Sequence, residues 1–195
     1  WELISPNQNN ASTKGIAKAS SKRVTFDKDR TKLYLFGGIG NYSGDQFEKT
    51  CTSSISPWAT DVGIYCWLRD LWEYDFASKK FTNLIPSSST KVPLEGPIAL
   101  NYNDNTMYLM GGFTPSAVYN SGFYNSTNYS KQLYSYKLGS DGAFVTENAV
   151  TSVLPDTTVS GIGRNYLYFD GKLNKLIWAN QKGLYTLALS NSLVI

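Results

Sequence analysis

The feature that most constrains this chain is an internal repeat of a short apolar segment that runs into a pair of glycines. Residues 32–38 read KLYLFGG, and residues 106–112 read TMYLMGG. A third and weaker copy, NKLIWAN, spans residues 174–180 and has Ala179–Asn180 in place of the glycines. Such self-similarity is typical of folds built from repeated supersecondary units, so the repeat governs how the rest of the chain is interpreted.

Each copy of the repeat is flanked by other short segments with the alternation and the aromatic content of β-strands. Each unit therefore has four predicted strands: 23–27, 32–38, 70–75 and 80–84; then 99–103, 106–112, 132–137 and 143–146; then 166–170, 174–180, 183–188 and 193–195. No sustained helical periodicity is present. The pattern predicts an all-β chain, and four short strands per repeat are typical of the blades of a β-propeller.

This arrangement resembles the kelch repeat. The resemblance rests on an apolar strand that ends in a glycine doublet, followed by one aromatic residue in the third strand and another near the fourth. The residues that carry it are Gly37, Gly38, Gly111, Gly112, Trp72, Tyr134, Tyr185, Phe81 and Phe144. The resemblance implies kelch-like propeller blades, in which the four glycines, Trp72 and Tyr134 are structural. Glycine suits the crowded end of an inner strand because it adopts positive φ freely and lets backbones approach closely.

The repeat also predicts how the chain is divided. Residues 16–92 form a blade with a long insertion, 93–149 a second blade with an insertion, and 150–195 a degenerate third blade. Residues 1–5 read as an outer strand that belongs either to a preceding blade or to the closing blade. Three blades are fewer than the roughly four to eight of typical propellers. We therefore expect other chain segments, or a second copy of the chain in a homo-oligomer, to complete a larger ring.

The first two units are enlarged between their second and third strands, by roughly residues 39–69 and 113–131. In a propeller these two connections emerge on the same face, and loops on a rigid scaffold often carry binding function. Aromatic side chains are favoured anchors at protein interfaces. The predicted binding surface consists of Phe47, Trp58, Tyr65, Tyr119, Phe123 and Tyr124. The alternative is that these aromatic residues fold back and cover the blades.

The two cysteines of the chain, Cys51 and Cys66, lie close together in the first insertion. We expect a disulfide between them, with a pair of free thiols as the alternative; a zinc site is disfavoured because the chain has no histidine. Four Asn-x-Ser/Thr sequons lie in predicted loops, where a glycan would not disturb a core: Asn10, Asn41, Asn125 and Asn128. Together these features favour a secreted or cell-surface glycoprotein.

Several function classes are disfavoured by residue types. Without histidine the chain lacks the commonest general base and the main imidazole metal ligand. The resemblance implies that copper-dependent kelch-like oxidases are excluded as well, since they need histidine ligands. Glu73 and Asp75 share a face by their spacing, but such carboxylates usually lie in solvent or pair with lysine. Asp104 and Asp170 fall in predicted turns, which suit aspartate. We expect no catalysis by this chain, no metal and no cofactor.

Charge and hydropathy limit the kinds of partner that are expected for the chain. The net charge of +3 is too small to indicate nucleic-acid binding, and the basic residues between Lys14 and Lys32 are interrupted by Asp27 and Asp29. These residues are expected to form a solvated strand edge. No apolar run approaches the roughly 20 residues that cross a bilayer, so no membrane span is expected in the chain.

The resulting hypothesis is an extracellular protein-interaction or assembly module, whose partner is another protein or the remaining segments of the propeller. Two alternatives stay open. The chain could belong to a secreted carbohydrate-active or oxidase-type propeller enzyme whose catalytic groups lie on other segments. It could instead be a structural subunit of an extracellular filament or coat, joined through unpaired terminal strands.

Overall fold

The computed structural model describes residues 19–20, 23–41, 65–85, 96–111, 132–140, 144–146, 165–180 and 183–189. In these residues the chain is all-β, with strands arranged in three antiparallel sheets. The predicted all-β class is therefore confirmed. A search of the same ranges for a helix long and apolar enough to cross a membrane finds none.

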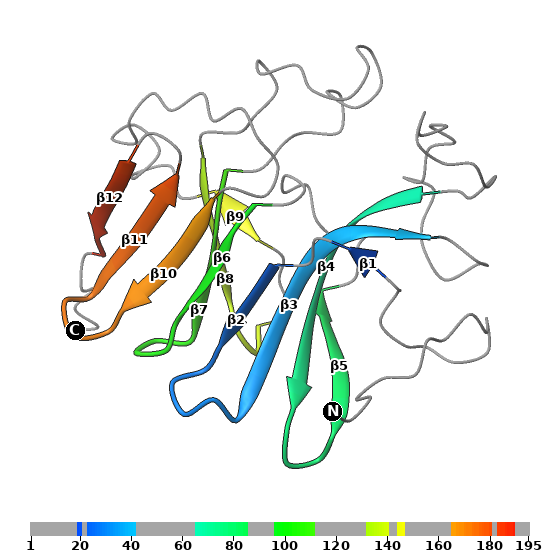
Figure 1. Cartoon of the computed structure of the whole chain (residues 1–195). Helices are drawn as coiled ribbons and strands as arrows, with labels where there is room; N and C mark the ends of the chain where they lie inside the picture. Colours follow the sequence, from blue (N-terminus) through cyan, green and yellow to red (C-terminus); the bar gives the residue numbers. More distant parts are fainter. Residues whose placement is uncertain are drawn as a thin grey trace, which may run out of the picture.

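Figure 1 shows the three sheets side by side, in the order in which they occur along the chain. The first sheet contains β1 (Ala19–Ser20), β2 (Arg23–Phe26), β3 (Lys32–Asn41), β4 (Tyr65–Asp75) and β5 (Lys80–Ile85). The second contains β6 (Ile98–Asn101), β7 (Thr106–Met110), β8 (Leu133–Lys137) and β9 (Val145–Thr146). The third contains β10 (Tyr166–Asp170), β11 (Lys175–Asn180) and β12 (Gly183–Ala188).

The repeated segments occupy the same place in successive sheets. β3, β7 and β11 each pair with the strand before them and the strand after them in the sequence. A backbone hydrogen bond recurs as well, from the residue after the third strand to the residue before the second. Its members are Phe76 to Thr31 at 3.0 Å, Leu138 to Asn105 at 2.9 Å, and Leu189 to Asn174 at 3.1 Å. The first two segments are therefore equivalent in register as well as in sequence, whereas the third is displaced by one residue, so that Lys175 and not Asn174 corresponds to Lys32 and Thr106.

The prediction of a loop over 39–69 is wrong at both ends. β3 continues to Asn41, β4 begins at Tyr65, and the two strands pair through Ile39–Trp67, Gly40–Cys66 and Asn41–Tyr65. The register shifts between Phe36 and Gly38, where Gly37 and Gly38 have φ of 62° and 99°. Because this bulge absorbs the glycine doublet, pairing resumes beyond it instead of ending there. β1, which the sequence did not predict, pairs with this extension of β3.

Period-two alternation gives every sheet two apolar faces. We call the face that contains Tyr34 and Phe36 in β3, Tyr108 and Met110 in β7, and Ile177 and Ala179 in β11 the forward face. The rear face contains Leu33 and Leu35 and their equivalents. Paired residues of adjacent strands share a face, so the register assigns each residue of a sheet to one of the two.

The forward face of the first sheet packs against the rear face of the second. Tyr34, Phe36 and Leu71 meet Leu100, Met107 and Leu109 in one buried cluster. Phe144, which precedes β9, closes this cluster with its ring 5.7 Å from that of Phe36 at an interplanar angle of 72°. The position that the kelch resemblance assigns to a fourth-strand aromatic thus contributes to the contact between sheets.

The forward face of the second sheet packs in the same sense against the rear face of the third. Met110 and Leu133 meet Leu167, Leu176 and Trp178 in a second buried cluster. The first strands of neighbouring sheets also lie in contact, β2 against β6 and β6 against β10. The same two faces are therefore used twice in the same order, and each sheet depends on its neighbour for its core.

Candidate functional site

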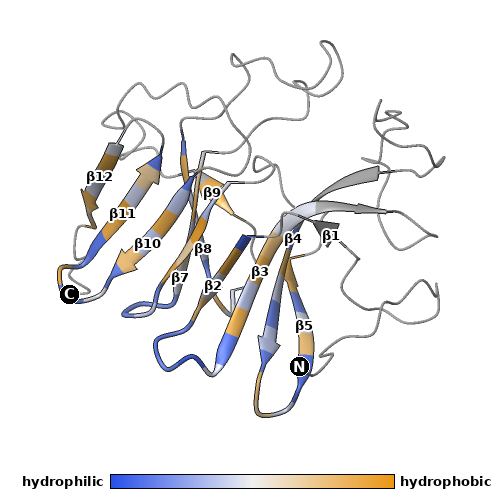
Figure 2. Cartoon of the chain, in the orientation of Figure 1, coloured by the Kyte–Doolittle hydropathy of each residue, from blue (hydrophilic) through white to orange (hydrophobic). Residues whose placement is uncertain are grey.

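The sheets present two different ends. The hairpin turns β2–β3, β4–β5, β6–β7 and β10–β11 lie at one end, and the β3–β4 and β7–β8 connections leave the sheets at the other (Figure 1). Figure 2 shows that the β2–β3 and β6–β7 turns are hydrophilic, whereas the β4–β5 and β10–β11 turns also contain hydrophobic residues. The strand ends that flank the two insertions thus lie on one side of the sheets, as expected from the sequence.

One polar residue stabilises each of the three first turns. Asp27 accepts a hydrogen bond from the Lys32 amide at 2.9 Å, and Asn101 accepts one from the Asn103 amide at 3.0 Å. Asp170 accepts hydrogen bonds from the amides of Lys172 and Leu173 at 2.9 and 3.1 Å. Side-chain oxygens at this position satisfy amides that the tight turn leaves unpaired. The prediction that Asp170 serves its turn is confirmed, and Asp104 does the same by accepting from the Thr106 amide at 3.0 Å.

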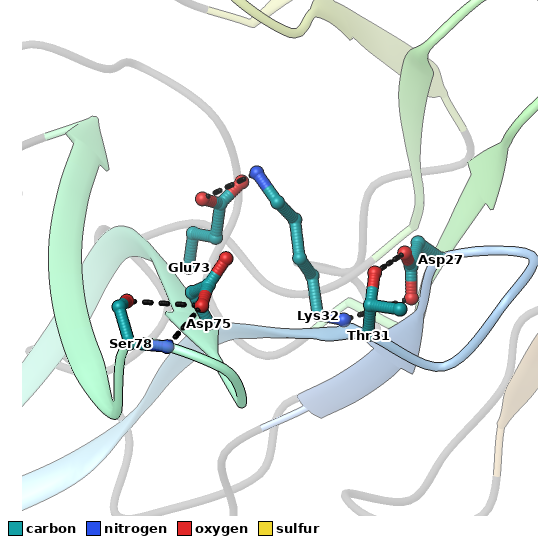
Figure 3. Close-up of polar contacts among 6 residues, drawn as sticks. All are labelled: Asp27, Thr31, Lys32, Glu73, Asp75 and Ser78. Carbon is teal, nitrogen blue, oxygen red and sulfur yellow. Dashed lines mark hydrogen bonds and ion pairs between the residues drawn. The ribbon is translucent and has the colours of Figure 1, made fainter.

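The polar groups at the hairpin end of the first sheet form a cluster, in which the bonds between Asp75 and Ser78 are separate from those made by Lys32 (Figure 3). Its centre is an ion pair in which Lys32 Nζ lies 2.9 Å from Glu73 Oε1. The two residues come from adjacent strands, β3 and β4, and lie on the forward face. The hydrogen bond to the Glu73 carboxylate is the main cause that raises the pKa of Lys32, although burial opposes it. Glu73 is thus paired with a lysine, as the sequence suggested.

The remaining carboxylates of Figure 3 serve the turns beside them. Asp75 Oδ1 accepts hydrogen bonds from the Ser78 amide at 2.7 Å and from the Ser78 hydroxyl at 2.9 Å. These bonds, with the amide bond first, lower the pKa of Asp75. Asp27 Oδ2 accepts a bond from the Thr31 hydroxyl at 2.5 Å. The cluster therefore holds two hairpins in place.

The chemistry open to this cluster is restricted by those contacts. Tyr34 lies beside Glu73 on the forward face, and burial, followed by the Glu73 charge, raises the pKa of its hydroxyl. A phenol with a raised pKa stays protonated and acts as a hydrogen-bond donor. Among the residues that the structure describes, no group of three or more His, Cys, Asp or Glu side chains is placed to hold a metal ion.

The glycine and aromatic positions of the kelch resemblance have clear local roles. Gly111, like Gly37 and Gly38, has a positive φ, of 65°. Its amide donates to the Gln132 carbonyl at 2.9 Å, which closes the β7–β8 pair directly after β7. Trp72 is buried, and its indole N–H donates to the buried Asp70 carboxylate at 2.5 Å. Tyr134 is also buried and donates to Gln132 at 2.8 Å.

Most residues of the predicted binding surface lie outside the described ranges, as does Gly112. The same is true of Cys51, of the sequons at Asn10, Asn125 and Asn128, and of Phe47, Trp58, Tyr119, Phe123 and Tyr124. Tyr65, Cys66 and Asn41 are strand residues, not loop residues, because β3 and β4 extend into the insertion. Their roles in binding, disulfide formation and glycosylation stay predictions.

Two separate surfaces that the sequence analysis did not single out are the sheet faces that no described sheet covers. On the forward face of the third sheet, Tyr166, Tyr168 and Leu184 are 67%, 62% and 70% exposed. On the rear face of the first sheet, Val24 and Phe26 are 53% and 45% exposed. Exposed apolar residues that gather on one face are typical of interaction surfaces. The alternation of the strands could have revealed these faces, since both sides of each sheet are apolar.

Comparisons with known proteins identify no family. No protein-family model matches the chain, and no curated protein matches it. Among solved structures, the chain is similar to one described as "Structure of YjhT", with a TM-score of 0.47 and 13% identity. The similarity covers 89% of this chain and 53% of that chain. The chain thus spans about half the length of that structure, and a likeness at this level assigns it to no family.

Proposed function

We propose that the chain forms kelch-like blades of a β-propeller and acts outside the cell as a protein-interaction or assembly module. The observation that carries the proposal is the repeated packing of equivalent faces, forward against rear, in two successive pairs of sheets. The contacts of β2 with β6 and of β6 with β10 add to it. These contacts support the proposal, because the blades of a propeller are sheets arranged side by side around a central channel.

The binding surface of this module is proposed to be the insertion end. Both insertions leave the sheets on the side opposite the hairpin turns (Figure 1), so residues from the two can act on one partner. Trp58 and Tyr124 are large aromatic residues, one from each insertion. Such residues are over-represented among those that dominate binding free energy at protein interfaces.

A non-catalytic role is supported by the way the carboxylates are used. Glu73 is paired with Lys32, and Asp27, Asp75, Asp104 and Asp170 each accept hydrogen bonds in a turn. The chain has no histidine. These five acidic residues therefore stabilise strand pairs and turns, which favours a scaffold over an enzyme. The sequons and the cysteine pair are the grounds for placing this scaffold outside the cell.

The proposal is tested by screening the immobilised chain against an array of extracellular protein domains and measuring the affinity of each binder found. We expect Trp58→Ala and Tyr124→Ala each to weaken binding by ~10-fold or more, as for residues that carry much of an interface. Leu173→Ala is the matched control, because Leu173 is an exposed apolar residue at the hairpin end. Unchanged affinity in both insertion variants, or equal loss in the control, would contradict the proposal.

A further inference from the structure

A leucine occupies the same position on the forward face of all three sheets. Leu71 pairs with Phe36, Leu133 with Met110, and Leu184 with Ala179. Leu71 and Leu133 are 0% exposed, because the rear face of the next sheet covers each of them, whereas Leu184 is 70% exposed. The third sheet thus repeats a surface that the first two sheets bury, without a described sheet in front of it.

The rear faces show the same relation at the other end of the stack. Phe26, Leu100 and Phe169 are equivalent first-strand residues, paired with Leu33, Met107 and Leu176 respectively. Leu100 and Phe169 are 3% and 2% exposed, but Phe26 is 45% exposed. Only the part of this rear face along β2 is exposed, since Trp72 and Tyr74 in β4 are buried. The first sheet therefore offers an uncovered rear face along β2.

The two uncovered faces are the two halves of one repeated interface. They lie on opposite sides of the second sheet (Figure 1), so a single chain does not bring them together. We propose that the forward face of the third sheet binds the rear face of the first sheet in a second copy of this chain. Each copy has one face of each kind, so two copies joined head to tail in both directions cover all four. This inference rests on the proposed blade arrangement.

Electrostatics permits this pairing. The charged residues of β10 and β11 on the forward face of the third sheet, Asp170 and Lys175, are directly paired across the two strands. The apolar residues between them and the insertion end are Tyr166, Tyr168, Ile177 and Ala179. A face with balanced charge and an apolar centre resembles the core of a stable subunit interface. The chain itself carries the complementary apolar face, which is why we assign the position to a second copy.

The test is the mass of the 195-residue chain in solution, measured by sedimentation equilibrium over a range of concentrations. We expect a species of twice the chain mass of 21.7 kDa. Tyr168→Glu and Phe26→Glu should each raise the dissociation constant by ~10-fold or more, because each places a charge in an apolar interface. Leu173→Glu is the matched control and should leave it unchanged, since Leu173 is 61% exposed but lies in a turn.

A mixing experiment tests the direction of the pairing. Tyr168→Glu leaves the rear face of the first sheet intact, and Phe26→Glu leaves the forward face of the third sheet intact. The two variants mixed should therefore associate more strongly with each other than either does with itself. Far-UV circular dichroism checks that both variants are folded.

Three outcomes would overturn the inference. If the chain stays monomeric at the highest concentration, the two faces are not covered by a second copy, and other sheets or another protein would have to cover them. An open series of larger species would exclude a closed pair. Loss of association in only one of the two variants would indicate that the same face of each copy forms the contact, and not the forward face of one with the rear face of the other. None of these outcomes bears on the insertion end, where Trp58 and Tyr124 test the proposed partner binding separately.

Discussion

The second and third sheets have closely similar strands but different surroundings. The second is covered on both faces, so Met107, Leu109, Met110 and Leu133 are all buried. Among the described sheets, the second covers the rear face of the third and none covers its forward face, which exposes Tyr166, Tyr168 and Leu184. The difference shows that the burial of a residue depends on whether a neighbouring sheet covers it and not on the strand in which it lies. This is expected where each unit contacts only its neighbours.

The largest predicted difference between the second and third sheets is in the cost of truncating the leucine that each has at the equivalent position. Leu133→Ala should lower the free energy of unfolding by about 2–5 kcal/mol, because it opens a cavity between two sheets. Leu184→Ala should change it by no more than about 0.5 kcal/mol, because that side chain is exposed. The measurement is urea denaturation of dilute protein, since self-association would bury Leu184. Equal effects at the two positions would mean that the third sheet is covered in solution even when dilute.

A smaller effect is expected where the turns of the second and third sheets touch. A Cβ atom at Gly171 would overlap the ring and hydroxyl of Tyr102, which packs edge-on against Phe169 with ring centroids 5.1 Å apart. Gly171→Ala should therefore destabilise the chain by about 1–3 kcal/mol. Thermal or urea unfolding measures the loss.

The control for this contact is a double-mutant cycle. In a Tyr102→Ala background the cost of Gly171→Ala should largely disappear, because the ring that the new methyl group would strike is absent. Lys172→Ala, an exposed change in the same turn, should be nearly neutral. An undiminished cost in the Tyr102→Ala background would place the strain within the turn and not between the sheets.

The smallest effect concerns the Lys32–Glu73 ion pair of the first sheet. The pKa of Lys32 is raised in the folded chain, so its contribution is fully present below the unfolded value of about 10.4 and is lost as the pH rises through the folded value. The Lys32 side chain is 38% exposed, and solvent screening limits the contribution to about 1 kcal/mol or less.

Glu73→Gln tests this pair without changing the shape of the side chain. The difference in melting temperature between the parent chain and Glu73→Gln should be constant from neutral pH to about pH 10 and should shrink above it. Lys80→Gln, which alters an exposed lysine in β5, controls for the general effect of removing a charge. A difference that grows with pH would contradict the assignment of the ion pair.

Much of the fold could be predicted because strand alternation is a local property. The predicted segments at 166–170 and 183–188 coincide with β10 and β12, and most others differ by only a few residues. The two glycine-ending segments occupy equivalent strands of different sheets. The β3–β4 extension could not be predicted, because it depends on whether a glycine doublet ends a strand or forms a bulge within it. In the second sheet the equivalent Gly111 directly follows the strand.

The polar sites differ from one another in how far the sequence could predict them. Asp104 and Asp170 follow from turn chemistry, which involves near neighbours in the chain. The partner of Glu73 required knowledge of register, because Lys32 is 41 residues away. The aromatic residues of the insertions were selected by residue type alone. Whether they meet on one surface depends on the conformation of long connections, which local alternation does not encode.

The amino-acid pattern alone determined that this chain is all-β, where most of its strands lie, and that both faces of each sheet are apolar, since side chains alternate every second residue. The tertiary structure decided which of those faces are covered. Leu71, Leu133 and Leu184 are the same residue type in the same register, yet only the first two are buried. The reason is physical: alternation is set within one strand, whereas burial needs a second sheet, and for Leu184 no described sheet supplies it.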